Sequence, residues 1–184
     1  MVLKETPTCE FGEKAFDFKL LGTDGKFWSL ADCVGDNGTL IMFICNHCPY
    51  VKAIQSKLVE DTKKMLKAGV KSVAIMSNDP EDYPEDSFEN MKKISRDYNY
   101  PFPYLFDETQ EIAKTYNAVC TPDFFGYNKS LDLQYRGRFD ETGMKQSSKE
   151  SKRDLLEAML QVSKTSKGPQ EQIPSVGCSI KWKI

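Results

Sequence analysis

The sequence has no long apolar run and very little histidine. No stretch of its 184 residues approaches the roughly 18 apolar residues that span a membrane. Residues 1–7 lack the apolar core of a secretory signal. We therefore expect a cytoplasmic protein with no membrane partner. The single histidine excludes any site that needs two of them.

The sequence also has no large excess of one charge and few glycines and prolines. The chain has 25 Lys and Arg against 27 Asp and Glu, so no nucleic-acid partner is expected. There are 11 glycines and 9 prolines, too few for a low-complexity chain, and 40% of the residues are hydrophobic. The length suits one domain, which we place at residues 1–164, with an extended tail packed on it at 165–184.

The order of strand and helix patterns predicts an α/β fold. A turn at residues 22–25 separates two short strands and predicts an N-terminal β-hairpin. Residues 39–44 form a continuous apolar run, typical of a strand buried on both faces. Helical spacing follows from Val51 to Leu66, and a second buried strand is predicted at 70–76. This order is a βαβ unit, and a last helix is predicted over residues 155–162.

Six cysteines are too few for a disulfide-stapled secreted module, and only Cys45-Asn46-His47-Cys48 brings two of them close together. The pair falls where a buried strand ends and a helix begins, and the unpaired N–H groups there favour a thiolate. We predict that Cys45 lies at the exposed edge and Cys48 one turn later, more deeply buried. His47 is a candidate to stabilise the thiolate, and a solvated loop role is equally open to it.

A zinc half-site is the alternative interpretation of the cysteine pair. Zinc usually needs two further ligands, and the sequence has no second CxxC or HxxxH. A third ligand from Cys120 or Cys178 has no support in the sequence. We therefore expect no metal and no cofactor.

Seven blocks of sequence, in order along the chain, resemble peroxiredoxin-like proteins of the thioredoxin family. The family that these blocks resemble belongs to the redoxin branch, which includes the alkyl hydroperoxide reductase and thiol-specific antioxidant proteins. The blocks lie at residues 16–26, 43–52, 77–79, 104–110, 120–125, 135–140 and 177–182. The resemblance implies a thioredoxin-like fold, with a mixed central sheet flanked by helices, an N-terminal β-hairpin extension and a C-terminal tail.

The same resemblance implies that Pro122 is the cis-proline that faces the CxxC pair. A cis X–Pro bond costs little and proline has no N–H. The backbone of Thr121 would then be free to pair with an extended substrate segment. Thr121 and Pro122 are accordingly the expected substrate-binding residues.

Two features depart from typical peroxiredoxins, which carry a Pro-x-x-x-Thr-x-x-Cys pattern. Aligned on Cys48, this chain has Ile41 in place of the Pro and Cys45 in place of the Thr. The hydroxyl that would orient a peroxide is thus replaced by a thiol. Arg136 and Arg138 are candidates to stabilise a thiolate, but alternation on a strand favours a solvated face near Asp140.

These observations predict a thiol–disulfide oxidoreductase. Cys45 attacks a disulfide of a protein or small molecule, Cys48 resolves the mixed disulfide, and a thiol reductant restores the pair. The alternatives are an antioxidant thiol peroxidase that reduces hydroperoxides and a non-catalytic module that binds a metal or a partner. Cys120 and Cys178 are candidate auxiliary thiols. If the tail folds back over the site, Cys178 supplies a resolving thiol; otherwise the tail is structural.

Overall fold

A mixed sheet of seven strands forms the centre of the computed structural model, which describes residues 2–145 and 151–184. The strand order is β3-β2-β6-β5-β4-β8-β9. The strands are β2 (Lys19–Gly22), β3 (Phe27–Ser29), β4 (Gly38–Phe43), β5 (Val70–Met76), β6 (Tyr104–Phe106), β8 (Asp123–Tyr127) and β9 (Leu133–Tyr135). β5 runs parallel to both β4 and β6, and the other neighbours are antiparallel. The predicted mixed sheet is confirmed.

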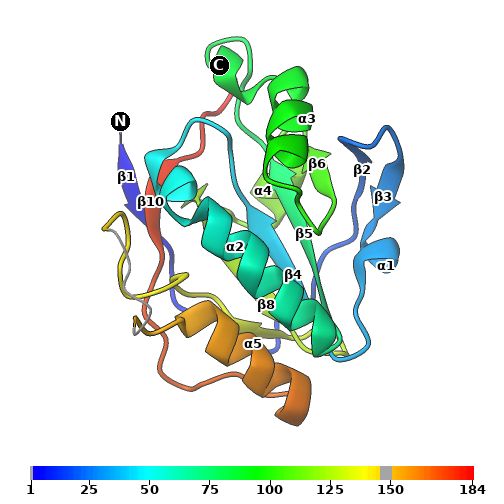
Figure 1. Cartoon of the computed structure of the whole chain (residues 1–184), viewed down its shortest axis with the longest axis vertical. Helices are drawn as coiled ribbons and strands as arrows, with labels where there is room; N and C mark the ends of the chain where they lie inside the picture. The colour runs from blue at the N-terminus through cyan, green and yellow to red at the C-terminus, as the bar shows by residue number, and fades with distance from the viewer. Residues whose placement is uncertain (1, 146–150) are drawn as a thin grey trace.

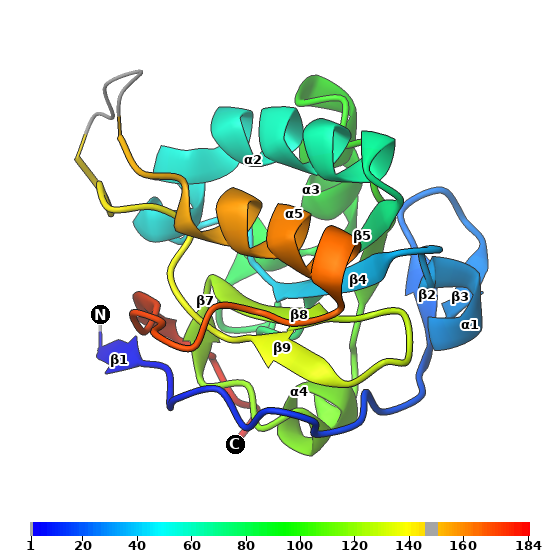
Figure 2. The same cartoon turned by 90° about the horizontal axis from the view of Figure 1, so that it is seen from below.

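Helices cover both faces of this sheet. They are α1 (Leu30–Cys33), α2 (Pro49–Lys67), α3 (Phe88–Asp97), α4 (Glu111–Thr115) and α5 (Asp154–Thr165). Figure 2 shows α2, α3 and α5 above the sheet and α4 below it. Within the described residues, none of the helices combines the length and the apolar character needed to cross a membrane.

The core explains why β4 is one uninterrupted apolar run. Every residue of β4 is buried. Leu40 and Met42 pack in the cluster that includes the inner face of α2 and α5, whereas Ile41 and Phe43 pack in the cluster on the α4 side. Because successive side chains of a strand point to opposite faces, a strand with helices on both sides must be apolar throughout.

A second, three-stranded sheet lies beside the start of α2 and was not predicted from the sequence. Its order is β1-β10-β7, formed by β1 (Leu3–Glu5), β10 (Val176–Ser179) and β7 (Cys120–Thr121). Strands β1 and β10, from opposite ends of the sequence, therefore lie side by side (Figure 1). The segment after residue 165 was expected to be extended; part of it is a strand whose pairing brings Cys178 next to Thr121.

Candidate active site

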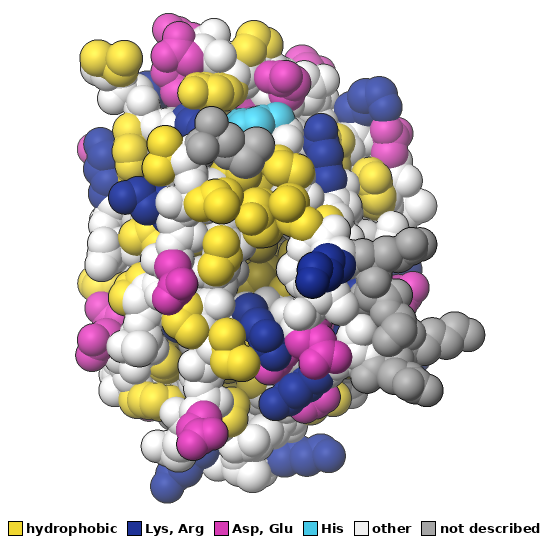
Figure 3. Space-filling view, turned by 90° about the vertical axis from the view of Figure 1, so that its left-hand side faces the viewer, with side chains coloured by type: hydrophobic (Ala, Val, Ile, Leu, Met, Phe, Trp, Pro, Cys, Tyr) yellow, Lys and Arg dark blue, Asp and Glu magenta, His cyan; other side chains and the backbone are white. Residues whose placement is uncertain are grey.

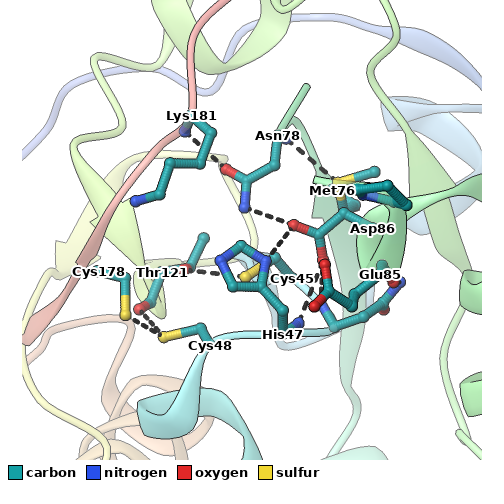
Figure 4. Close-up of polar contacts among 12 residues, drawn as sticks. Cys45, His47, Cys48, Met76, Asn78, Glu85, Asp86, Thr121, Cys178 and Lys181 are labelled. Carbon is teal, nitrogen blue, oxygen red and sulfur yellow. Dashed lines mark hydrogen bonds and ion pairs between the residues drawn. The ribbon is translucent and has the colours of Figure 1, made fainter. Parts of the chain in front are cut away.

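The cysteine pair lies in the turn between β4 and α2, at the predicted junction of a buried strand and a helix. α2 starts at Pro49, which lacks an N–H and suits the first helical position, so Cys48 is the N-cap residue. Cys45 lies three residues earlier, outside the helix. The prediction that Cys45 is exposed is wrong: Cys45 is 2% exposed and Cys48 is 0% exposed. Both sulfurs are buried because β7 and β10 cover the turn (Figure 4).

Two residues distant in sequence, Thr121 and Cys178, contact the two sulfurs. The Sγ atoms of Cys48 and Cys178 lie 2.8 Å apart. Cys48 Sγ is 3.1 Å from the carbonyl oxygen of Thr121, and Cys45 Sγ is 3.3 Å from the Thr121 hydroxyl. Thr121 therefore contacts both members of the pair, one through its backbone and one through its side chain.

Cys48 is the more acidic thiol of the pair. Hydrogen bonds from the thiols of Cys45 and Cys178 and from the backbone N–H groups of Val51 and Cys178 lower the pKa of Cys48 to about 5, against the opposing effect of burial. Burial raises the pKa of Cys45 well above its usual range, and the carboxylate of Asp86 adds to this effect. Cys48 lies at the N-terminus of α2, whose partial positive charge favours a thiolate, whereas Cys45 lies outside the helix.

Asp86 organises the turn that carries the pair. It is fully buried and its carboxylate accepts four hydrogen bonds. The donors are the backbone N–H of Asn46 at 2.7 Å, the backbone N–H of His47 at 3.2 Å, the His47 ring Nδ1 at 2.6 Å and the side-chain amide of Asn78 at 2.8 Å. The sequence analysis missed Asp86, since it lies 38 residues beyond Cys48 in a short 3₁₀ helix, Pro84–Asp86.

His47 is fixed by this carboxylate rather than solvated. The hydrogen bond that the His47 ring donates to Asp86 raises the pKa of His47, and burial opposes the shift. The ring also stacks on Tyr83, with centroids 5.3 Å apart. A protonated His47 favours a thiolate at Cys48, and a thiolate there in turn raises the pKa of His47.

The loop at residues 120–122 has the expected geometry but not the expected open edge. The Thr121–Pro122 bond is cis, as predicted. The edge of Thr121, where an extended substrate was expected, is already paired with Cys178 of β10. Cys120 is also buried, but its Sγ lies 3.5 Å from the Pro122 carbonyl and burial strongly raises its pKa. Because strand neighbours point to opposite faces, Cys120 points away from the face that Thr121 presents to Cys45.

Arg136 was predicted to lie on a solvated face, and this is wrong. It is 4% exposed; its guanidinium contacts the carboxylate of Asp123 at 3.0 Å and donates to the Asn117 carbonyl at 2.8 Å. Arg138 pairs with Asp154 instead of Asp140. Short-range alternation fails here because β9 ends at Tyr135, before either arginine.

An apolar cavity of about 210 Å³ opens beside Pro122. Apolar side chains gather on this face, which Figure 3 shows from the side of β1 and β10. The apolar lining consists of Tyr50, Ile54, Pro122, Phe139, Ile173, Pro174 and Val176, with Arg138, Asp140 and Glu141 also contributing. A small molecule with an apolar body would fit here, next to the cis-proline.

Three potential metal ligands also meet in the site. Single ligand atoms of Cys45, His47 and Asp86 lie within 4.8 Å of one another. A thiolate, an imidazole and a carboxylate are donors that zinc accepts. However, the Asp86 carboxylate already accepts four hydrogen bonds, one of them from His47. A bound cation would have to replace the His47–Asp86 contact.

A mixed sheet between helices, with a cis-proline loop against a cysteine pair at a helix start, defines the thioredoxin fold. The AhpC/TSA family model matches residues 11–139, so the chain belongs to the AhpC/TSA family. This membership confirms the predicted redoxin resemblance and supports an oxidoreductase in general. None of the curated proteins matches the chain.

Solved structures extend the same comparison. An uncharacterized conserved protein from Geobacillus kaustophilus is 44% identical, with a TM-score of 0.94 over 100% of this chain and 97% of that chain. A hypothetical protein from Sinorhizobium meliloti 1021 is 36% identical, with a TM-score of 0.92 over 97% of this chain and 98% of that chain. Peroxidoxin BcpB from Mycobacterium tuberculosis, 14% identical with a TM-score of 0.61 over 84% of this chain and 96% of that chain, shares the fold.

Proposed function

We propose that the chain is a thiol–disulfide oxidoreductase whose redox couple is Cys45 and Cys48. The observation that carries the proposal is the position of Cys48 as the N-cap of α2, with its pKa lowered to about 5. A thiol with this pKa is a thiolate at neutral pH, and the thiolate is the form that attacks a disulfide. His47, held by Asp86, supports the charge.

The reaction proceeds by two exchanges. The Cys48 thiolate attacks one sulfur of the substrate disulfide, forms a mixed disulfide and releases the other half as a thiolate. Cys45 then loses its proton and attacks Cys48 Sγ, which forms the Cys45–Cys48 disulfide and releases the second half. The substrate gains two electrons from the pair, one proton from the Cys45 thiol and one proton from solvent. An external thiol restores the reduced pair. This order reverses the sequence-based assignment, in which Cys45 attacks first.

We place the substrate beside Pro122, where the apolar cavity opens. Thr121 contributes by contacting both sulfurs. A small disulfide suits this entry better than a folded protein, because the strand-pairing edge of Thr121 is occupied by β10.

Trapping of the mixed disulfide tests the order of attack. In a Cys178→Ser background, which removes the neighbouring thiol, a Cys45→Ser change should accumulate an adduct with oxidised glutathione, whereas Cys48→Ser should not. Mass spectrometry of the alkylated protein gives the readout. Adducts on Cys48→Ser alone would restore Cys45 as the attacking residue, and absence of turnover with insulin and with small disulfides would remove the proposed function.

Hydroperoxide reduction is the second candidate, and membership of the AhpC/TSA family favours it. The Cys48 thiolate would attack the peroxide, become a sulfenic acid and release water or an alcohol, and a second thiol would condense with it to a disulfide and water. Two features count against it: a thiol replaces the peroxide-orienting hydroxyl at Cys45, and Arg136 is engaged with Asp123. Direct measurement of hydrogen peroxide and organic hydroperoxide consumption with excess thiol decides between the two reactions.

A binding role for the Cys45, His47 and Asp86 group is the remaining alternative. Elemental analysis of the protein as purified, before and after a chelator, tests it. One equivalent of zinc in an inactive protein would favour the binding module, whereas full disulfide turnover after chelation would support the oxidoreductase.

A further inference from the structure

β10 occupies the place where a substrate strand would bind. In the antiparallel register, Cys178 lies opposite Thr121 and Ser179 opposite Cys120. Gly177 permits this close approach, since a Cβ atom there would lie 2.2 Å from the Thr121 carbonyl oxygen. The chain's own C-terminal segment thus pairs with the residue before the cis-proline, as an extended peptide would.

The thiol of β10 is already in contact with the active pair. Cys178 and Cys48 Sγ atoms are separated by 2.8 Å, whereas a disulfide bond is about 2.05 Å long. Both residues are buried, at 1% and 0% exposure. Burial and the neighbouring Cys48 raise the pKa of Cys178 to about 12. In the reduced state the Cys178 thiol therefore donates to the Cys48 thiolate.

Hydrogen bonds link the chain beyond β10 to the rest of the site. The backbone N–H of Lys181 donates to the Asn78 side chain at 2.9 Å. The amide of Asn78 donates to Asp86 at 2.8 Å, and Asp86 holds His47 (Figure 4). One end of β10 is thereby fixed to the carboxylate that supports the cysteine turn.

The outer edge of β10 is covered only lightly. It pairs with β1, a strand of three residues, all of them exposed. The inner side of the strand is held more firmly. Gly177 and Cys178 are buried, and the hydroxyl of Ser175, just before the strand, donates to the Pro122 carbonyl at 2.9 Å. β10 is therefore fixed at both ends, which keeps Cys178 beside Cys48.

We propose that β10 acts as an intramolecular substrate strand and that Cys178 is a third redox-active thiol, which exchanges disulfides with Cys48. The proposal rests on the proposed function of the Cys45–Cys48 pair. When that pair is oxidised, the Cys178 thiolate attacks Cys48 Sγ. The Cys48–Cys178 bond forms, the Cys45–Cys48 bond breaks, and the Cys45 thiolate takes up the proton that Cys178 released. The step moves a disulfide within the chain and consumes no external oxidant.

The test uses the full-length Cys45→Ser variant with one equivalent of diamide. Cys48 and Cys178 should together transfer two electrons to diamide, which takes one proton from Cys178 and one from solvent. They should form one disulfide, identified by acid quenching, alkylation and peptide mapping. A second measurement uses oxidised glutathione at about 1 mM in place of diamide. In Cys45→Ser, Cys178 should attack the glutathione adduct on Cys48 and release glutathione, because a neighbouring thiol in the chain outcompetes millimolar thiol in solution. Cys45→Ser should therefore hold at least about tenfold less adduct than Cys45→Ser/Cys178→Ser. Adding Cys9→Ser to Cys45→Ser is the matched control and should change nothing.

Two outcomes would overturn the proposal. In the first, Cys48 and Cys178 of the Cys45→Ser variant both remain open to alkylation after diamide. In the second, the glutathione adduct persists equally with and without Cys178. The wild-type chain separates this failure from failure of the proposed function. If it forms only the Cys45–Cys48 disulfide, the oxidoreductase stands and the tail is structural; if it forms neither disulfide, the proposed function fails as well.

A second variant tests the docking of β10 without removing a thiol. Gly177→Ala should push β10 away from Thr121, reduce Cys48–Cys178 bridging several-fold and speed alkylation of Cys48. Ile184→Ala removes an exposed side chain from the same C-terminal segment, outside the cavity, and should leave both unchanged. Equal bridging in Gly177→Ala and Ile184→Ala would show that the strand pairing does not direct the exchange.

Discussion

Replacement of the buried carboxylate of Asp86 should change both the charge of His47 and the stability of the fold. Asp86→Asn keeps the shape of the side chain but removes the charge that accepts two backbone N–H groups, the His47 ring and the Asn78 amide. The pKa of His47 should therefore fall, because its largest upward influence is the hydrogen bond to this carboxylate.

The expected loss of stability follows from the hydrogen bonds. A hydrogen bond to a charged group contributes about 1.5–3 kcal/mol, and breaking a fully buried ion pair costs about 3–5 kcal/mol. Because the His47 side chain is 18% exposed and the asparagine amide can still accept some of these hydrogen bonds, we expect a loss of about 2–4 kcal/mol of unfolding free energy.

The loss should depend on pH in a defined direction. Folding raises the pKa of His47, so its protonated form stabilises the fold fully below the unfolded value of about 6.5. That contribution disappears as the pH rises through the raised folded value. The stability difference between wild type and Asp86→Asn should accordingly be largest near pH 5–6 and smaller above the folded pKa.

The single histidine makes the measurement direct, because one imidazole resonance reports the titration. Urea unfolding at several pH values gives the stability. Glu85→Gln, which removes a neighbouring but exposed carboxylate, should change neither quantity appreciably. An unchanged His47 midpoint in Asp86→Asn, or a stability loss that does not vary with pH, would refute the reasoning.

Three further predictions concern charge and packing. In the reduced wild type, thiolate absorbance at 240 nm should change with pH around a midpoint near 5, and Cys48→Ser should lack this change. A change that survives in Cys48→Ser would assign the charge to another thiol. Arg136→Met should cost about 3–5 kcal/mol of unfolding free energy by leaving a buried carboxylate unpaired, against less than about 1 kcal/mol for the partly exposed Arg138→Met. Leu58→Ala should cost about 2.7–5 kcal/mol through a core cavity, and equal losses in the half-exposed Leu66→Ala would contradict the packing.

Much of the central layer could be predicted from the sequence because its signals are local. The apolar run of β4 and the helical spacing of α2 are each visible within about twenty residues, and the structure has both. The error at Cys45 is long-range in origin. Thr121 of β7, 76 residues away in the sequence, contacts the Cys45 sulfur in the turn that β7 and β10 cover, and no local pattern indicates this burial.

Long-range pairing could not be predicted in the same way. Asp86 meets Asn46 across 40 residues, and Cys178 meets Cys48 across 130. No periodic pattern connects such positions. One indication is available: Asn78 follows the end of β5, and functional loops gather at the carboxyl ends of strands. In the structure, Asn78 joins Asp86 to the C-terminal segment.

Burial of all three sulfurs has a consequence for the rate of any reaction at this site. Cys45, Cys48 and Cys178 are each at most 2% exposed, so the low pKa of Cys48 alone cannot make it reactive toward an external disulfide. The observed rate is the intrinsic rate multiplied by the fraction of molecules in which the site is open. Every 1.4 kcal/mol needed to open it lowers the rate about tenfold. Substrates that enter by the cavity beside Pro122 avoid displacing β10, whereas those that pair with Thr121 must separate β10 first, and this difference would select small disulfides over extended peptides.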